Sequence, residues 1–96
     1  MTTLRKGSKG SEVSKLQNLL KLAGENVVID GDFGNQTETA VKNFQKKRQI
    51  VVDGVVGSQT WGVLDSILYE AIGRATVKAL EDMGNLPSVD ELLSLL

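Results

Sequence analysis

The chain has 96 residues, of which 41% are hydrophobic and 24% are charged, and its net charge is −1. This composition is typical of one globular domain and excludes a disordered chain. The near-neutral charge argues against nucleic-acid binding, which needs surplus lysine and arginine. Because cysteine and histidine are both absent, disulfides and thiolate chemistry are excluded, and carboxylates are left as the plausible acid–base groups.

The first predicted helix follows a glycine- and serine-containing segment over residues 4–10. Ser11 is the expected N-cap, because apolar residues recur behind it every three or four positions. Gly24 is expected to end the helix as its C′ residue. The predicted buried face consists of Val13, Leu16, Leu19, Leu20 and Ala23.

A D-G-x-x-G-x-x-T cassette then occurs twice, over residues 30–37 and 53–60. In each copy Asp-Gly predicts a turn, since the carboxylate can accept backbone N–H groups just ahead and glycine tolerates a positive φ. The second glycine lets the backbone reverse, and a helix opens after it. The predicted structural turn residues are Asp30, Gly31, Gly34, Asp53, Gly54 and Gly57.

Each cassette leads into a predicted helix. The second helix is expected over about 36–47, with Ala40, Val41 and Phe44 buried, and the third helix is expected from about Ser58. Thr37 and Thr60 should brace the helix starts, whereas Gln17 and Gln45 should be core amides bonded to loop backbone.

The third helix has no obvious end in the sequence. Apolar residues keep a helical spacing as far as Met83, and a capping-box start at Ser88 predicts a last helix over 89–96. We therefore predict an all-α fold with a module over 1–65 and a C-terminal helical hairpin extension over 66–96.

Residues at characteristic spacings match the pattern of a known family over residues 4–64. They include Leu4, Gly7, Gly10, Val13, Leu16, Gln17 and Leu20, both cassettes, Ala40, Val41, Phe44, Gln45, Trp61 and Leu64. This pattern closely resembles the peptidoglycan-binding domain type 1 family. One departure is Gln49, which stands where the family often has a glycine. Residues 66–96 match nothing in the family and are too short for a catalytic domain.

The resemblance implies a small orthogonal three-helix bundle that binds bacterial cell-wall peptidoglycan without cleaving it. Such modules are usually attached to amidases, transpeptidases or phage endolysins. No apolar run is long enough for a membrane span, and no signal peptide is evident. We therefore expect a phage or prophage protein made in the bacterial cytoplasm that acts at the cell wall and needs no cofactor.

The candidate ligand-binding residues lie in or beside the cassettes. A shallow groove there could read the ligand through polar side chains and the N–H groups of the helix starts, which attract the acidic ends of stem peptides. The candidates are Asp32, Phe33, Asn35, Gln36, Thr37, Ser58, Gln59 and Trp61. Glycan and stem peptide both remain open as the bound part.

The aromatic candidates have a second interpretation. Sugars stack on aromatic faces, so Phe33 and Trp61 could form a platform for a glycan. However, Trp61 stands at a helix start beside apolar neighbours, which favours a core position. For Phe33, which lies in the turn itself, core and surface positions are equally open.

Catalytic and metal-binding alternatives are weaker. Asp30 and Asp53 could be catalytic carboxylates, but a turn role explains both, and a glycosidase needs an acid of raised pKa opposite a second carboxylate. Residues 30–34 resemble the start of a calcium-binding EF-hand loop. Asn35 and Val41 then stand where that loop needs glycine and glutamate, so no metal site is expected.

A rival function rests on the C-terminal region. Residues 67–96 are rich in apolar positions and could bind a partner protein or a second copy of the chain. The chain would then be an interaction protein that retains the fold. The apolar hairpin could also simply enlarge the core of the module.

Overall fold

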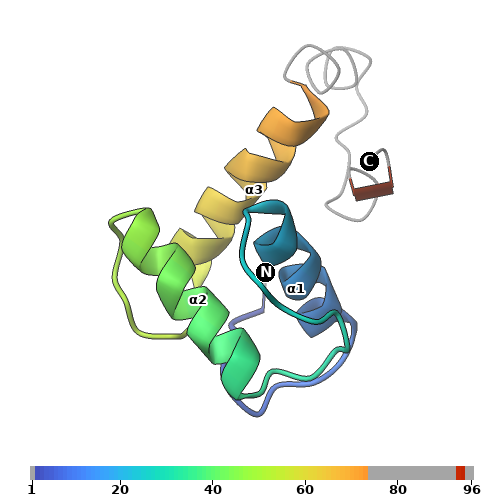
Figure 1. Cartoon of the computed structure of the whole chain (residues 1–96), viewed down its shortest axis with the longest axis vertical. Helices are drawn as coiled ribbons and strands as arrows, with labels where there is room; N and C mark the ends of the chain where they lie inside the picture. The colour runs from blue at the N-terminus through green and yellow to red at the C-terminus, as the bar shows by residue number, and fades with distance from the viewer. Residues whose placement is uncertain (1, 74–92, 95–96) are drawn as a thin grey trace.

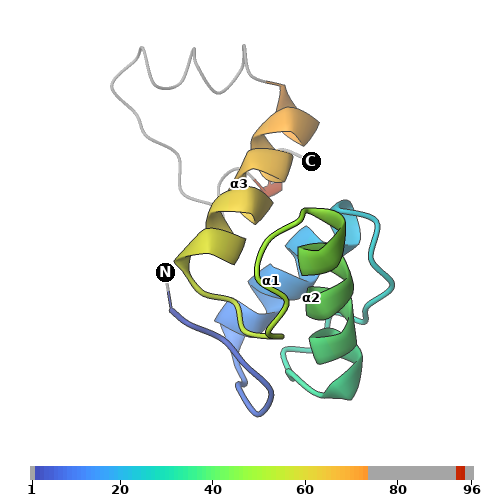
Figure 2. The ribbon, with the colours of Figure 1, turned by 90° about the vertical axis from the view of Figure 1, so that its left-hand side faces the viewer.

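A computed structural model describes residues 2–73 and 93–94, and it confirms the predicted all-α fold. Helices α1 (Ser11–Leu22), α2 (Asn35–Lys47) and α3 (Ser58–Ile72) cross one another, with α1 in contact with both others (Figures 1 and 2). The described part contains no strand beyond two isolated β-bridges. None of its helices is long and apolar enough to span a membrane.

All three helices begin directly after a glycine: Gly10, Gly34 and Gly57. The prediction that Ser11 is an N-cap is therefore wrong by one position, because Ser11 is the first helical residue. Gly10 has a φ of 120° and its N–H donates to the carbonyl of Gly31 at 2.9 Å. The N-cap position is set by this contact with the first cassette, which requires glycine.

The first two helices end in the same hydrogen-bond pattern. After α1, the N–H of Gly24 donates to Lys21 at 3.0 Å and that of Glu25 donates to Leu20 at 2.9 Å. After α2, Gln49 and Ile50 repeat these bonds with the corresponding carbonyls, at 3.2 and 3.1 Å. This is a Schellman motif, and Gly24 occupies its left-handed C′ position as predicted.

Helix α3 ends earlier than its apolar spacing predicts. It stops at Ile72, where Gly73 follows with a φ of 101°, so the prediction of one helix reaching Met83 is wrong. The apolar pattern runs on past Gly73, and periodicity alone does not register a glycine that reverses the backbone. Most of the predicted extension, including the helix over 89–96 apart from Leu93 and Ser94, lies outside the described residues.

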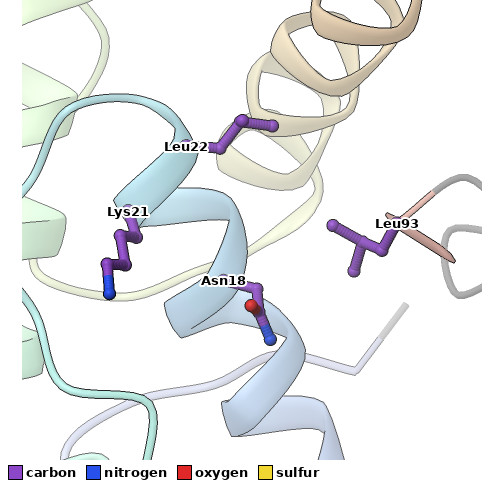
Figure 3. A pocket seen from close by; sticks show the side chains of 4 residues that line it. All are labelled: Asn18, Lys21, Leu22 and Leu93. Atoms are coloured by element: carbon purple, nitrogen blue, oxygen red, sulfur yellow. The ribbon is translucent and has the colours of Figure 1, made fainter. Parts of the chain in front are cut away.

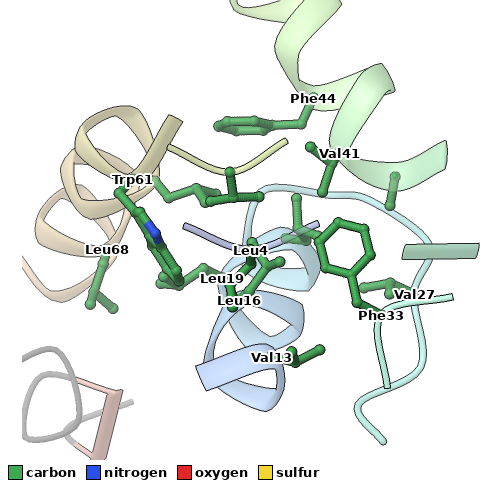
Figure 4. Packing of buried hydrophobic residues seen from close by; sticks show 14 residues of the cluster. Leu4, Val13, Leu16, Leu19, Val27, Phe33, Val41, Phe44, Trp61 and Leu68 are labelled. Carbon is green, nitrogen blue, oxygen red and sulfur yellow. The ribbon is translucent and has the colours of Figure 1, made fainter. Parts of the chain in front are cut away.

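One hydrophobic core joins the three helices (Figure 4). The predicted faces of α1 and α2 are buried apart from Ala23, which is partly buried, and Leu64 and Leu68 of α3 complete the interior. The core also takes in Leu4, Val27, Phe33 and Val56 from the segments between and beside the helices, and Trp61 from the start of α3.

The segment before α1 ties the two cassettes together. Leu4 exchanges two backbone hydrogen bonds with Val56 of the second cassette, at 2.8 and 3.1 Å. Four residues later, Ser8 accepts from Phe33 of the first cassette at 3.0 Å. Residues 4–10 are therefore part of the folded domain.

Candidate functional site

The first cassette is organised by the amide of Gln17, which is fully buried on α1. Its oxygen accepts from the N–H groups of Asp30 and Gly31, at 3.0 and 2.9 Å. Its nitrogen reaches the Asp30 carboxylate at 2.9 Å, the Asp32 carbonyl at 3.1 Å and the Thr37 hydroxyl at 3.1 Å. One side chain thus fixes both the turn and the start of α2.

The second cassette has the same arrangement around Gln45 of α2. Its amide oxygen accepts from Asp53 and Gly54, at 3.1 and 3.0 Å. Its nitrogen reaches the Asp53 carboxylate, the Val55 carbonyl and the Thr60 hydroxyl, at 3.0, 2.9 and 3.2 Å. The prediction that Gln17 and Gln45 are core amides bonded to loop backbone is confirmed.

The turn aspartates are structural acceptors. Asp30 accepts from the N–H of Asp32, and Asp53 accepts from that of Val55, each at 3.0 Å. These backbone bonds, followed by those from Gln17 and Gln45, lower the pKa of both carboxyls. A general acid needs a raised pKa, so the geometry favours the turn role over a catalytic one.

Three of the eight candidate ligand-binding side chains lie in the interior. Phe33 is 1% exposed, Thr37 is 2% exposed and Trp61 is 3% exposed. The indole N–H of Trp61 donates to the carbonyl of Thr2 at 2.8 Å. The two aromatic rings therefore fill the core, as Figure 4 shows, and do not form a stacking platform for sugars.

The other five candidates are exposed, but the structure does not bring them all together. Asn35 and Gln36 line a groove of about 610 Å³ beside α2. Ser58 and Gln59 occupy the corresponding positions at the start of α3 and do not line this groove, nor does Asp32. The groove thus belongs to the first cassette alone.

The groove lies between α2 and the loop that leaves α1, which run side by side in Figure 2. At one end Gln36 accepts from the N–H of Val28 at 3.1 Å. At the other end the ammonium of Lys47 binds the buried carboxylate of Glu25 at 2.9 Å. The walls are formed by Gly24, Glu25, Asn26, Asn35, Gln36, Thr39, Ala40 and Asn43.

Of these wall residues, only Asn35 and Gln36 are among the site residues predicted from the sequence. The helical side could have been found, because Asn35, Thr39 and Asn43 recur every four residues and so share one face of α2. The loop side had no such signal. Glu25 and Asn26 reach the groove because the loop folds back along α2, which no local pattern indicates.

A second depression lies at the end of α1 (Figure 3). It measures about 470 Å³ and is lined by Asn18, Lys21, Leu22 and Leu93. Leu93 is partly buried and packs against the core cluster. This side of α1 is thus partly covered by a residue of the predicted C-terminal extension.

Two further features bear on catalysis and metal binding. Burial raises the pKa of the Asp65 carboxyl, and its Oδ1 is buried without a hydrogen-bond partner. Among residues 2–73 and 93–94, however, no three or more acidic, histidine or cysteine side chains are grouped so as to hold a metal ion.

Over residues 2–73 the structure is thus a small three-helix module with an exposed groove beside α2. The family described as "Putative peptidoglycan binding domain" matches residues 9–64, and the chain belongs to this family.

Similar proteins carry the module as one part of a longer chain. A protein of Bacillus licheniformis named "Probable N-acetylmuramoyl-L-alanine amidase" is 38% identical over 82 residues. That match covers 82% of this chain and 23% of the amidase, so the chain spans about a quarter of that relative.

Solved structures show the same fold. The N-terminal domain of SleB superposes with a TM-score of 0.65 at 36% identity, covering 68% of this chain and 90% of that domain. A Burkholderia AP3 phage endolysin superposes with a TM-score of 0.65 at 43% identity. This second match covers 66% of the chain and 24% of the endolysin.

Proposed function

We propose that the chain binds bacterial cell-wall peptidoglycan without cleaving it and thereby holds an attached activity at the wall. The observation that carries the proposal is the family match over residues 9–64, which spans all of α1 and α2 and the first part of α3. The site supports it, because the cassette aspartates are engaged as structural acceptors and the exposed groove is lined almost entirely by neutral side chains.

The attached activity is a wall-lytic or wall-modifying enzyme, encoded by a phage or prophage. Support comes from the amidase and the phage endolysin, each of which contains a similar segment as about a quarter of its length. Tethering raises the effective concentration of a linked enzyme at its polymeric substrate, even when the module itself binds modestly.

Co-sedimentation tests the binding. The intact chain is mixed with purified insoluble peptidoglycan and, as a control for nonspecific adsorption, with insoluble cellulose. We expect the chain to pellet with peptidoglycan and to stay in the supernatant with cellulose. Equal recovery in both supernatants would overturn the proposal.

Fusion to a hydrolase tests the tethering. A wall-hydrolase catalytic domain that lacks a binding module of its own is compared with its fusion to this chain. We expect the fusion to clear a peptidoglycan suspension faster at low enzyme concentration, where residence at the wall limits turnover. An unchanged rate would argue against a targeting role.

A further inference from the structure

The α2 groove combines a neutral polar lining with unused hydrogen-bonding capacity. Of its wall residues, Glu25 is the one with a charged side chain, whereas charged residues make up 24% of the chain. The side chains of Asn26, Asn35, Thr39 and Asn43 take part in no hydrogen bond within the described part of the chain. Together they offer donors and acceptors that face a concave surface.

Three amides elsewhere in the molecule, those of Gln17, Asn18 and Gln45, are engaged within the protein. The buried amides of Gln17 and Gln45 each make five hydrogen bonds within the protein. Asn18, an exposed amide on α1, donates to the carbonyl of Ser14 at 3.1 Å. Gln49 and Gln59, which are exposed and lie outside the groove, take part in no side-chain hydrogen bond within the described residues either. What distinguishes Asn26, Asn35 and Asn43 is that all three amides line one groove.

The dimensions of the groove suit a short extended peptide. Asn35, Thr39 and Asn43 lie on one face of α2, and with a rise of about 1.5 Å per residue the row is about 12 Å long. About three to four residues of extended chain cover that length. The volume of about 610 Å³ lies within the range of about 300–1,000 Å³ that is usual for small-ligand sites.

We propose that this groove binds the stem peptide of peptidoglycan, in an extended form, through the peptide's backbone amides. The inference rests on the proposed function and specifies which part of the polymer is bound. Each peptide unit presents one N–H and one carbonyl, and the side-chain amides of Asn26, Asn35 and Asn43 can pair with both.

The lining favours a peptide over a glycan. A sugar ring buries an apolar face against an apolar partner, and Ala40 is the one apolar side chain among the wall residues. The aromatic rings of Phe33, Phe44 and Trp61, which could supply such a face, are in the core. The groove thus matches the chemistry of an amide chain and lacks a surface on which a sugar ring would stack.

Glu25 gives the groove a fixed acceptor on the loop side. Its side chain is 5% exposed and one carboxylate oxygen is bonded to Lys47, which holds the carboxylate in place. The lone pairs left on the carboxylate accept an N–H group of the bound peptide. Donors in the ligand are therefore directed towards the loop, and carbonyl groups towards the amides of α2.

The test compares groove variants of the full chain on two forms of peptidoglycan. The groove variant combines Asn35→Ala with Asn43→Ala; both side chains are exposed, so the fold should be retained, which circular dichroism checks. The matched control is Asn18→Ala, an exposed amide outside the groove. The second form of peptidoglycan is stripped of its stem peptides by an amidase.

We expect the unaltered chain and Asn18→Ala to co-sediment equally with intact peptidoglycan. Both should stay in the supernatant when the stem peptides have been removed. The groove variant should bind intact peptidoglycan at least tenfold more weakly. In an NMR titration with a synthetic stem peptide, the side-chain NH₂ signals of Asn26, Asn35 and Asn43 should change chemical shift. The NH₂ signal of Asn18 should keep its chemical shift.

Other outcomes overturn the inference in distinguishable ways. If the groove variant pellets as well as the unaltered chain, peptidoglycan binding stands but the groove is not its site. If stripped peptidoglycan binds as well as the intact polymer, the glycan is the ligand. If the unaltered chain does not pellet with intact peptidoglycan, the proposed function itself is wrong, and this inference fails with it.

Discussion

The two cassettes share their hydrogen bonds but differ in what surrounds them. Gln17 lies 13 residues before Asp30, whereas Gln45 lies 8 residues before Asp53. The additional residues of the first half lengthen α1 beyond its glutamine and lengthen the loop that follows. That loop runs back along α2 and forms a wall of the groove. The same local network thus holds a turn after a short loop and after a long one, and the longer loop forms part of a surface.

The largest expected effect comes from removing the central amides. Gln17→Leu and Gln45→Leu each leave buried donors and acceptors unpaired, and we expect each to lower the free energy of unfolding by about 3–5 kcal/mol. Urea denaturation monitored by circular dichroism measures both. Similar losses would show that the two networks are equivalent, and a loss below about 1 kcal/mol at either would contradict that role.

A smaller effect should separate the two Asp-Gly turns. A Cβ on Gly31 would lie 3.3 Å from the backbone oxygen of Gly10, whereas one on Gly54 would meet the flexible side chains of Lys42 and Glu38. Both glycines have a positive φ, so both alanine variants are strained. We expect Gly31→Ala to cost about 2–3 kcal/mol and Gly54→Ala about 1–2 kcal/mol. Thermal and urea unfolding would show the order, and a reversed order would contradict it.

The C′ positions provide a third contrast. Gln49 has a φ of 58°, at the position equivalent to Gly24, and a side chain in the left-handed region is strained. We expect Gln49→Gly to stabilise the protein by about 0.5–1 kcal/mol, and Gly24→Ala to destabilise it by about 1 kcal/mol. A Cβ on Gly24 meets nothing within 4 Å, so that cost is conformational. If Gln49→Gly is instead less stable, the glutamine side chain makes a stabilising contact that outweighs the strain of its positive φ.

The smallest effect concerns pH. The pKa values of Asp30 and Asp53 are lowered in the folded state, so their contribution to stability is complete above the unfolded pKa of about 3.9. It is lost as the pH falls through the lowered folded values. We expect the double variant Asp30→Asn, Asp53→Asn to lose part of the pH dependence of unfolding below about pH 4, because an asparagine oxygen accepts the same bonds without titrating.

Acid titrations of the unfolding free energy, with Asp32→Asn as the control, measure this effect. Asp32 is exposed, and within the described residues its side chain accepts no turn hydrogen bond of the kind made by Asp30 and Asp53. An unchanged pH slope in the double variant would show that the turn carboxylates do not contribute to acid sensitivity.

Much of the fold could be predicted from the sequence because its signals are local. Helical spacing gave the buried faces of α1 and α2, and the cassettes gave the turns and the starts of α2 and α3. The N-cap of α1 was predicted at the wrong residue because the conformation of Gly10 is fixed by a hydrogen bond to Gly31, which is distant in sequence. The end of α3 was missed because apolar spacing continued past Gly73.

The site was harder to predict because it depends on contacts between segments that are distant in sequence. The apolar neighbours of Trp61 favoured the core position that it has, whereas the turn position of Phe33 left core and surface equally open. The groove depends on a loop lying against a helix, so its walls come from segments that show no common pattern. Asn35 and Gln36 were found because they belong to the cassette, whereas Glu25 and Asn26 became visible only in three dimensions.

The hydrogen bond between Trp61 and Thr2 makes tryptophan fluorescence a probe of how the chain folds. Trp61 is the single tryptophan of the chain, and its indole is bonded to a carbonyl 59 positions away in sequence. Its fluorescence therefore responds to docking of the N-terminal segment against α3, whereas far-ultraviolet circular dichroism responds to the helices. In a refolding experiment the two signals would time separate events, namely formation of the helices and closure of the chain around them.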